Sequence, residues 1–103
     1  MSNFGHNRER QLADRLRKEE GWYVFRSAGS LGVADLIAMH KGRATRFIEV
    51  KATKAGPFAG FGPSDRADLL EAAEMAGAQA WLVWWPKYGK PKWIPPGEWP
   101  GRR

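Results

Sequence analysis

The stretch VADLIAMHKGRATRFIEVKATK, residues 33–54, decides the fold of this chain. Residues 33–39 and 45–52 are runs rich in aliphatic and β-branched side chains, and each is long enough for one strand. Between the two runs, Lys41-Gly42-Arg43 fits a tight turn. The stretch therefore predicts two strands that pair as a hairpin within a larger sheet.

Asp35, Glu49 and Lys51 are charged side chains that interrupt the apolar pattern of these strands. Side chains alternate between the two faces of a strand, so residues two apart share a face. We expect one face of the second strand to carry Phe47, Glu49 and Lys51, and one face of the first to carry Asp35, Ile37 and Met39, opposite Ala34, Leu36 and Ala38. Two carboxylates and an ammonium among apolar neighbours are costly unless they neutralise one another or a bound ion. A divalent cation between the carboxylates, with the lysine beside it, is the arrangement of a metal-dependent phosphodiesterase.

Periodicity and turn residues predict the remaining elements. In chain order we expect a helix over 5–20 closed by Gly21, a strand over 22–25, a turn over 27–32, the two hairpin strands, a loop over 53–63, a helix over 65–76 with Ser64 as N-cap, a strand over 80–85 and an edge strand over 92–94. This order, αβββαββ, predicts a single α/β domain with a mixed central sheet flanked by helices. We expect the domain to span residues 1–94 and a basic, proline-rich tail to span 95–103.

Composition and net charge limit the partners and metals that the chain is expected to bind. The chain has 103 residues, a net charge of +6 and a pI near 10.1, which indicates a polyanionic partner or a generally basic surface. Cysteine is absent and the only histidines are His6 and His40, which excludes disulfides and thiolate sites and argues against a histidine-rich zinc site. Any metal should be a hard cation bound by oxygen, Mg²⁺ or Mn²⁺. With no membrane-length apolar run and no signal-peptide pattern, we expect no membrane partner and a cytoplasmic location.

A third carboxylate comes from the predicted first helix, where Glu9 shares a face with two leucines. Asp35 and Glu49, with the backbone carbonyl of Val50, are the candidate Mg²⁺ ligands, and Glu9 is expected to ligate directly or through water. Lys51 is expected to orient the attacking water, stabilise developing charge or act as a base, and these roles stay open. The alternative is structural: an edge-strand ion pair between Lys51 and Glu49, with Glu9 capping a helix.

Basic and aromatic residues near these positions are candidate DNA contacts. Phe58 and Phe61 lie in the glycine- and proline-rich loop, where they either stack on bases or hold the loop in place. Ser30 either stabilises its turn or contacts a phosphate. The candidate DNA-binding set is Arg8, Arg10, Arg26, Lys54, Phe58, Phe61 and Arg66, with ordinary surface charge as the alternative for Arg10 and Arg26.

Asp35 and the triplet Glu49-Val50-Lys51, with thirteen residues between them, resemble the signature of the PD-(D/E)xK nuclease superfamily, with Ala34 where many members have proline. The segments Glu9-Arg10, 24–30, 33–38 and 48–54 together resemble the archaeal-type Holliday junction resolvases, in order over about residues 5–85. This resemblance implies a restriction-endonuclease-like core.

The resemblance also implies an endonuclease that uses Mg²⁺ to resolve four-way DNA junctions by paired symmetric nicks. It implies a homodimer, a catalytic set of Glu9, Asp35, Glu49 and Lys51, a further active-site hydroxyl on Ser30, and phosphate contacts from Arg10 and Arg26. The carboxyl end is shorter and richer in proline than in archaeal members, so the dimer surface stays open, and a phage or thermophile origin would suit the composition. The alternatives are a related nuclease that acts on flaps, forks or duplex DNA, and a catalytically silent DNA-binding module.

Overall fold

The computed structural model describes residues 4–27, 33–86 and 88–101. Its elements are α1 (Phe4–Glu20), β1 (Tyr23–Arg26), β2 (Leu36–His40), β3 (Arg43–Lys51), α2 (Pro63–Met75), β4 (Gln79–Trp84), β5 (Lys92–Ile94) and a short 3₁₀ helix η1 (Pro96–Glu98). The predicted order of elements is therefore confirmed.

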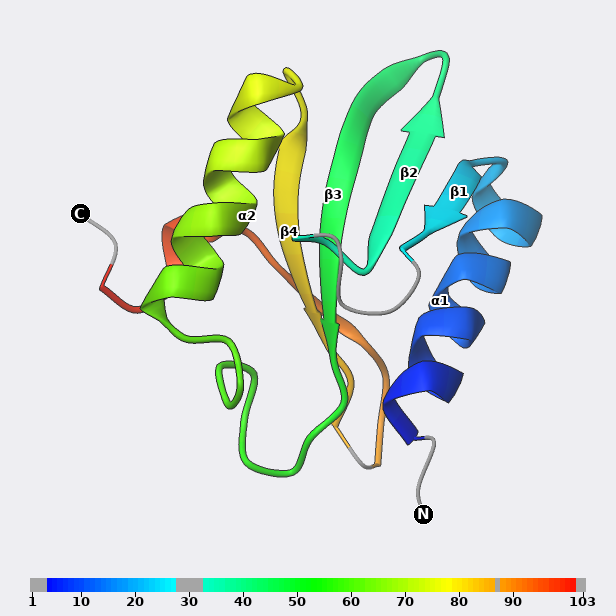
Figure 1. The fold of residues 1–103 in the computed structure, drawn as a ribbon. Coiled ribbons are helices and arrows are strands. Elements are labelled where there is room, and N and C mark those ends of the chain that lie inside the picture. Colours follow the sequence, from blue (N-terminus) through cyan, green and yellow to red (C-terminus); the bar gives the residue numbers. More distant parts are fainter. Residues whose placement is uncertain (1–3, 28–32, 87, 102–103) are drawn as a thin grey trace.

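The five strands form one sheet in the order β1-β2-β3-β4-β5 (Figure 1). β3 and β4 are parallel, and the other neighbouring pairs are antiparallel. A parallel pair needs a crossover connection, and α2 with the loop before it provides this connection. The sheet is thus mixed, as the sequence predicted.

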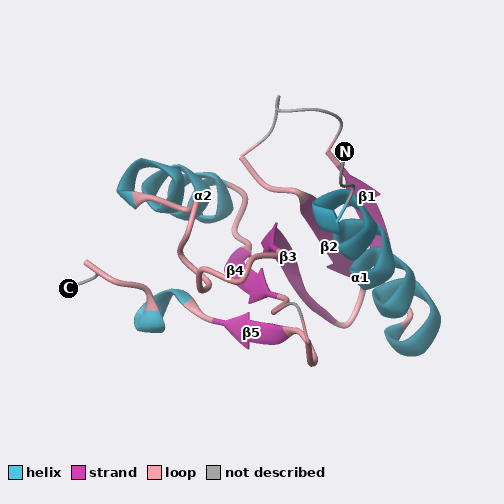
Figure 2. Ribbon diagram, turned by 90° about the horizontal axis from the view of Figure 1, so that it is seen from below, coloured by secondary structure: helices cyan, strands magenta, loops and turns pink. Residues whose placement is uncertain are grey.

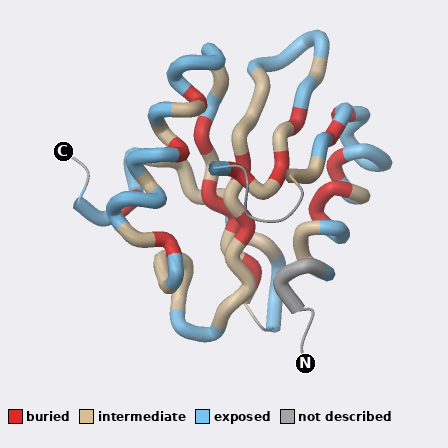
Figure 3. The backbone as a smooth tube through the Cα atoms, in the orientation of Figure 1, coloured by how far each residue is buried: buried red, intermediate tan, exposed pale blue. Residues whose placement is uncertain are grey.

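The two helices cover opposite faces of the sheet, and each covers a separate core (Figures 1 and 2). α1 packs against β1, β2 and β3, whereas α2 packs against β3 and β4. The α1 core contains Leu12, Ala13, Leu16, Trp22, Val24, Leu36, Ala38, Ile48, Val50, Val83 and Trp85; the α2 core contains Ala34, Phe61, Leu69, Ala73, Ala80, Leu82 and Trp99. Figure 3 shows buried segments on the inner strands and on the inward faces of both helices. Neither helix is long and apolar enough to cross a membrane, within the part of the chain that the structure describes.

α2 begins earlier than the sequence predicted. Its N-cap is Gly62, and Pro63 is the first helical residue, so the expected N-cap at Ser64 is wrong. Proline suits the first helical position because its fixed φ is already helical and its missing N–H has no partner there. The Gly62 N–H donates to Asp65 Oδ2 at 3.4 Å, so Asp65 satisfies a backbone group at this end.

Residues 95–101 pack against the domain, where the sequence predicted a tail. The Trp99 ring is only 4% exposed, meets the Phe61 ring edge-on at 5.1 Å and donates its Nε1–H to the Ile94 carbonyl at 3.1 Å. The expectation therefore needs correction over this segment, because a buried indole with a satisfied N–H anchors it. Arg102 and Arg103 lie outside the described residues.

Candidate active site

Glu49 and Lys51 lie at the carboxyl end of β3, on the sheet face that also carries α2. Their neighbour Phe47 packs against the α2 core, whereas Ile48 and Val50 belong to the α1 core, so the predicted alternation is confirmed in β3. Lys51 Nζ lies 3.2 Å from Glu49 Oε2, and the two side chains are only 24% and 17% exposed. The sequence thus places an ion pair in a largely buried position.

Asp35 is held against β3 by backbone groups. Its N–H donates to the Ile48 carbonyl at 2.9 Å, and its carboxylate Oδ2 accepts the Val50 N–H at 2.8 Å. On the other side, the Ser27 N–H donates to the Asp35 carbonyl at 2.9 Å. Because Leu36 pairs with Ile48, the same register continued by one residue puts Asp35 opposite Glu49.

The chain around Asp35 departs from the predicted strand. β2 begins at Leu36 rather than at residue 33, and Ala34 packs in the α2 core while Leu36 and Ala38 pack in the α1 core. The expectation that Ala34 shares a face with Leu36 is therefore wrong. Strict alternation requires regular extended backbone, and residues 33–35 precede the strand.

The surroundings of Glu49 perturb its ionisation. Burial and the nearby charge of Asp35 raise the pKa of Glu49 from its ordinary value of 4.5 to about 7, although Lys51 acts in the opposite direction. Asp65 at the start of α2 raises this pKa further. The site thus holds more negative charge than its lysine compensates, and a bound cation would relieve the imbalance.

Glu9 lies on α1 and pairs with an arginine of β1. Arg26 Nη2 donates to Glu9 Oε1 at 3.5 Å, and the Glu9 side chain is 19% exposed. Within residues 4–27, 33–86 and 88–101, no group of three or more histidine, aspartate or glutamate side chains is arranged to hold a metal. The structure brings Asp35, Glu49 and Lys51 together, and the part assigned to Glu9 stays a prediction. Ser30 lies outside the described residues.

Two features near Lys51 were not predicted as parts of the site. Gly60 has a φ of +75°, and a Cβ added there would lie 3.6 Å from Lys51 Nζ. The loop before α2 therefore folds back over the amine. Asp65 begins the helix that the sequence predicted over 65–76 and was not assigned to the site, but it acts electrostatically on Glu49. Loop closure and helix placement are tertiary features, so neither role had a local signal.

The aromatic residues of this loop are largely structural. Phe61 is 1% exposed in the α2 core, which leaves its ring covered rather than open to bases and favours the alternative role of holding the loop in place. Phe58 is half-buried and packs against the same core. Arg66 donates from Nη1 to the Phe61 carbonyl at 2.7 Å and lies 6.0 Å from the Phe58 ring, so it also fastens the loop.

The other predicted DNA contacts differ in their surroundings. Arg10 and Lys54 are exposed. Arg8 lies 4.5 Å from the centre of the Trp85 ring and donates to Gln11 Oε1 at 2.9 Å. These three residues remain predicted contacts, together with Arg26.

Arg46, for which the sequence predicted no role, is enclosed by aromatic rings on the α1 face of the sheet. The Arg46 guanidinium lies 4.8, 5.5 and 5.2 Å from the ring centres of Trp22, Trp81 and Trp93. Cation–π contacts of this kind stabilise packing where a ring and a guanidinium are partly desolvated. Arg46 is thus a structural residue of the α1 face.

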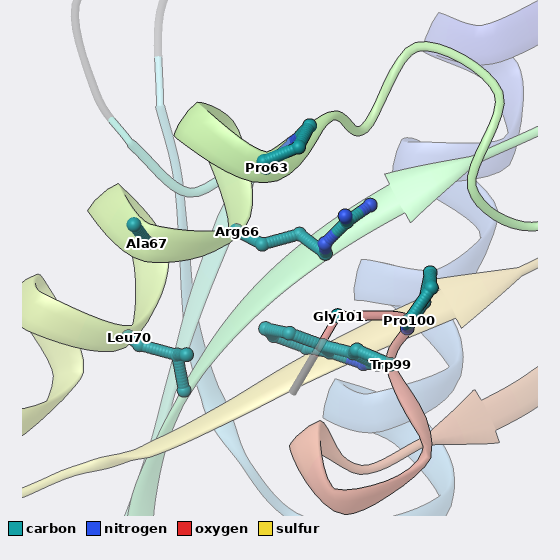
Figure 4. A pocket seen from close by; sticks show the side chains of 7 residues that line it. All are labelled: Pro63, Arg66, Ala67, Leu70, Trp99, Pro100 and Gly101. Carbon is teal, nitrogen blue, oxygen red and sulfur yellow. The ribbon is translucent and has the colours of Figure 1, made fainter. Parts of the chain in front are cut away.

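A pocket of about 270 Å³ lies between α2 and the carboxyl-terminal segment (Figure 4). Its lining residues are Pro63, Arg66, Ala67, Leu70, Trp99, Pro100 and Gly101. None of the acids of the site lines it. The candidate chemistry therefore resides at the Asp35–Glu49–Lys51 group rather than in this pocket.

Comparison with known proteins identifies the family of the chain and a similar solved structure. The family model described as archaeal Holliday junction resolvase (Hjc) matches residues 1–98. Among solved structures, the chain is similar to Hjc, a Holliday junction resolvase of the archaeal hyperthermophile Archaeoglobus fulgidus. The identity is 27% and the TM-score 0.75, over 90% of this chain and 73% of that chain. No curated protein matches the chain.

Proposed function

Because this chain belongs to the archaeal Holliday junction resolvase family, we propose that Asp35, Glu49 and Lys51 perform the cleavage by which it resolves four-way DNA junctions. The protein is a nuclease that binds branched DNA, and its sheet and helices match those of a resolvase. The observation that carries the assignment of residues is the largely buried Glu49–Lys51 pair beside Asp35. In an ordinary surface ion pair, both groups lie in solvent and the pKa of the carboxylate is not raised by burial.

Membership of a nuclease family suggests that the protein depends on a divalent metal, and the oxygen donors of this site favour Mg²⁺. Asp35 and Glu49 offer hard carboxylate oxygens, and the Val50 carbonyl and Glu9 are further candidate donors. The unbalanced negative charge at Glu49 fits a cation, and the sequence has no cysteine to select a softer metal. Bound Mg²⁺ would polarise the scissile phosphate and acidify a coordinated water, and Mn²⁺ would be expected to substitute.

The protein's own side chains would then prepare the reaction. Lys51 sits within hydrogen-bond distance of Glu49, where its ammonium would stabilise negative charge that develops on the phosphate. The Val50 N–H fixes the orientation of the Asp35 carboxylate. The Arg26–Glu9 contact would hold a third carboxylate near the end of β1, available through water.

We further propose that the protein acts as a homodimer. A four-way junction has two-fold symmetry, and two active sites related by a two-fold axis would cut opposite strands symmetrically. Sedimentation at micromolar concentration tests this part, since a monomeric mass in the presence and absence of junction would contradict it.

The central experiment compares Asp35→Asn with wild type on a synthetic four-way junction and on linear duplex of the same sequence. We expect the variant to lose more than about 100-fold in the rate of junction cleavage in Mg²⁺, as expected for loss of metal-dependent charge stabilisation. Its junction affinity, measured by gel shift in EDTA, should stay within a factor of about three of wild type.

The matched control is Asp68→Asn, which removes an exposed carboxylate of α2 and should leave both measurements unchanged. Undiminished cleavage by Asp35→Asn would show that the wrong residue has been named. Equal cutting of junction and duplex by wild type would instead favour a nuclease without junction selectivity.

A further inference from the structure

An uncovered patch of apolar side chains lies on β1 and β2. Tyr23 is 70% exposed, Phe25 is 55% exposed and Met39 is 37% exposed. Ile37 lies between them and is half-buried. We call these four residues the β1–β2 patch. Contiguous apolar patches that stay exposed mark interaction sites more often than single exposed side chains do, so the patch is a candidate binding surface.

The patch shares its sheet face with the candidate active site. Pairing puts Phe25 opposite Ile37, and Ile37 opposite Phe47, which packs on the α2 side of the sheet. Glu49 is two residues further along β3, on the same face. α2 packs against β3 and β4, so it leaves this side of the face open.

The distance between the patch and the site is short. Phe25 lies in the cross-strand row of Ile37 and Phe47, two strands away from β3, and Glu49 lies two residues beyond Phe47 along β3. The spacing of strands and residues in a sheet then gives about 12 Å between the Cα atoms of Phe25 and Glu49. One residue beyond β1, the Ser27 N–H donates to the Asp35 carbonyl, which links the end of β1 to the site. About 12 Å is comparable with the width of a DNA groove, so one DNA molecule would reach both places.

The chemistry of a branch point suits this patch. In linear duplex every base pair inside the molecule is stacked on both sides, whereas a four-way junction interrupts stacking where its arms meet. An exposed base-pair face is flat and apolar, and aromatic side chains stack on such faces without reading sequence. Phosphate contacts are common to junction and duplex, so charge alone gives little selectivity between them.

We propose that Phe25, supported by Tyr23, stacks on the base pair exposed at the branch point and thereby positions a junction strand over Asp35 and Glu49. This inference rests on the proposed active site, because only that site makes the neighbouring face a DNA surface. Phe25 is a specificity-determining residue in this scheme and takes no part in the chemistry. Duplex offers no exposed face to it and gains nothing from it.

The test measures binding without cleavage. Junctions with 2-aminopurine at the branch point, or in the middle of an arm, are titrated in EDTA with wild type, Phe25→Ala and Phe25→Trp. Wild type and Phe25→Trp should change the fluorescence of the branch-point probe only, and Phe25→Ala should not. The junction affinity of Phe25→Ala should fall about 10- to 100-fold, the usual cost of losing one base–aromatic stack. Its duplex affinity should change less than about twofold.

The control Tyr88→Ala removes an aromatic side chain that is 82% exposed on the connection between β4 and β5, and should bind junction as wild type does. Phe25→Leu keeps an apolar strand residue but lacks the aromatic face, so it should behave as Phe25→Ala. Equal loss of junction and duplex affinity in Phe25→Ala would overturn the proposal. So would a change from dimer to monomer, which would show that a second copy of the chain covers the patch. These measurements report binding and do not depend on cleavage. They therefore test the role of Phe25 even if Asp35→Asn does not lower the rate of cleavage.

Discussion

Replacing Glu49 by glutamine should stabilise the metal-free protein at neutral and alkaline pH. Burial and the charge of Asp35 raise the pKa of Glu49 to about 7 in the folded state, against 4.5 in an ordinary setting. A carboxyl group with a raised folded pKa binds its proton more tightly in the folded protein than in the unfolded chain. Its protonated form therefore favours folding, and this contribution is complete below pH 4.5 and is lost as the pH rises through 7.

The magnitude follows from the two pKa values. Their difference, converted at about 1.36 kcal/mol per pKa unit, gives about 3 kcal/mol of lost free energy of unfolding by pH 8. At pH 5 the loss is below about 1 kcal/mol, because most folded molecules still hold the proton. Glutamine is neutral at every pH and resembles the protonated acid. Glu49→Gln should therefore exceed wild type by about 3 kcal/mol at pH 8 and by little at pH 5.

The assay is urea denaturation followed by tryptophan fluorescence, in EDTA, at half-unit steps from pH 5 to pH 8. The control is Glu71→Gln, which removes an exposed carboxylate of α2 and should follow the pH dependence of wild type. Parallel curves for wild type and Glu49→Gln would refute the reasoning, since they would show that Glu49 titrates alike in folded and unfolded chains. At pH 8, Mg²⁺ should stabilise wild type more than Glu49→Gln, because a ligand stabilises the state that binds it.

Three further predictions concern packing. Trp99→Ala should lower the free energy of unfolding by about 3–5 kcal/mol in urea titrations, because the ring is 4% exposed; a change near zero would mean that the segment is a free tail. Gly60→Ala and Gly56→Ala should each cost about 1–2 kcal/mol because both residues have positive φ. Only Gly60→Ala, which approaches Lys51, should also slow cleavage, and equal rates for the two variants would contradict this. Arg46→Ala should cost about 1–3 kcal/mol and alter tryptophan fluorescence, and unchanged fluorescence would count against its enclosure by the rings.

Local patterns carried most of the fold. The alternation around Glu49 identified β3 and its two faces, and Gly21, with a φ of +74°, follows α1 where the sequence placed its end. The end of α2, at Met75, lies one residue before the predicted end. The hairpin turn at 41–42 followed from its glycine. These signals lie within a few residues of the structure they determine, so a single sequence suffices to interpret them.

Features that depend on residues distant in the sequence could not be decided from the sequence. Phe61 lies in a glycine-rich loop, and its burial depends on Trp99, which is 38 positions further along the chain. Phe25 reads as an ordinary strand residue, and only the placement of α2 over β3 and β4 leaves it exposed. Burial of a side chain is a property of what packs over it, and this is settled by the whole domain.

The sequence by itself determined that carboxylates and a lysine interrupt apolar strands, and that the strands form a mixed sheet between two helices. Only the tertiary structure decided which groups from separate elements meet: the Val50 N–H holds the Asp35 carboxylate, and Arg26 contacts Glu9. The physical reason is that alternation along a strand follows from backbone geometry alone. The meeting of charges from α1, β1, β2 and β3 requires the long-range packing that buries both cores.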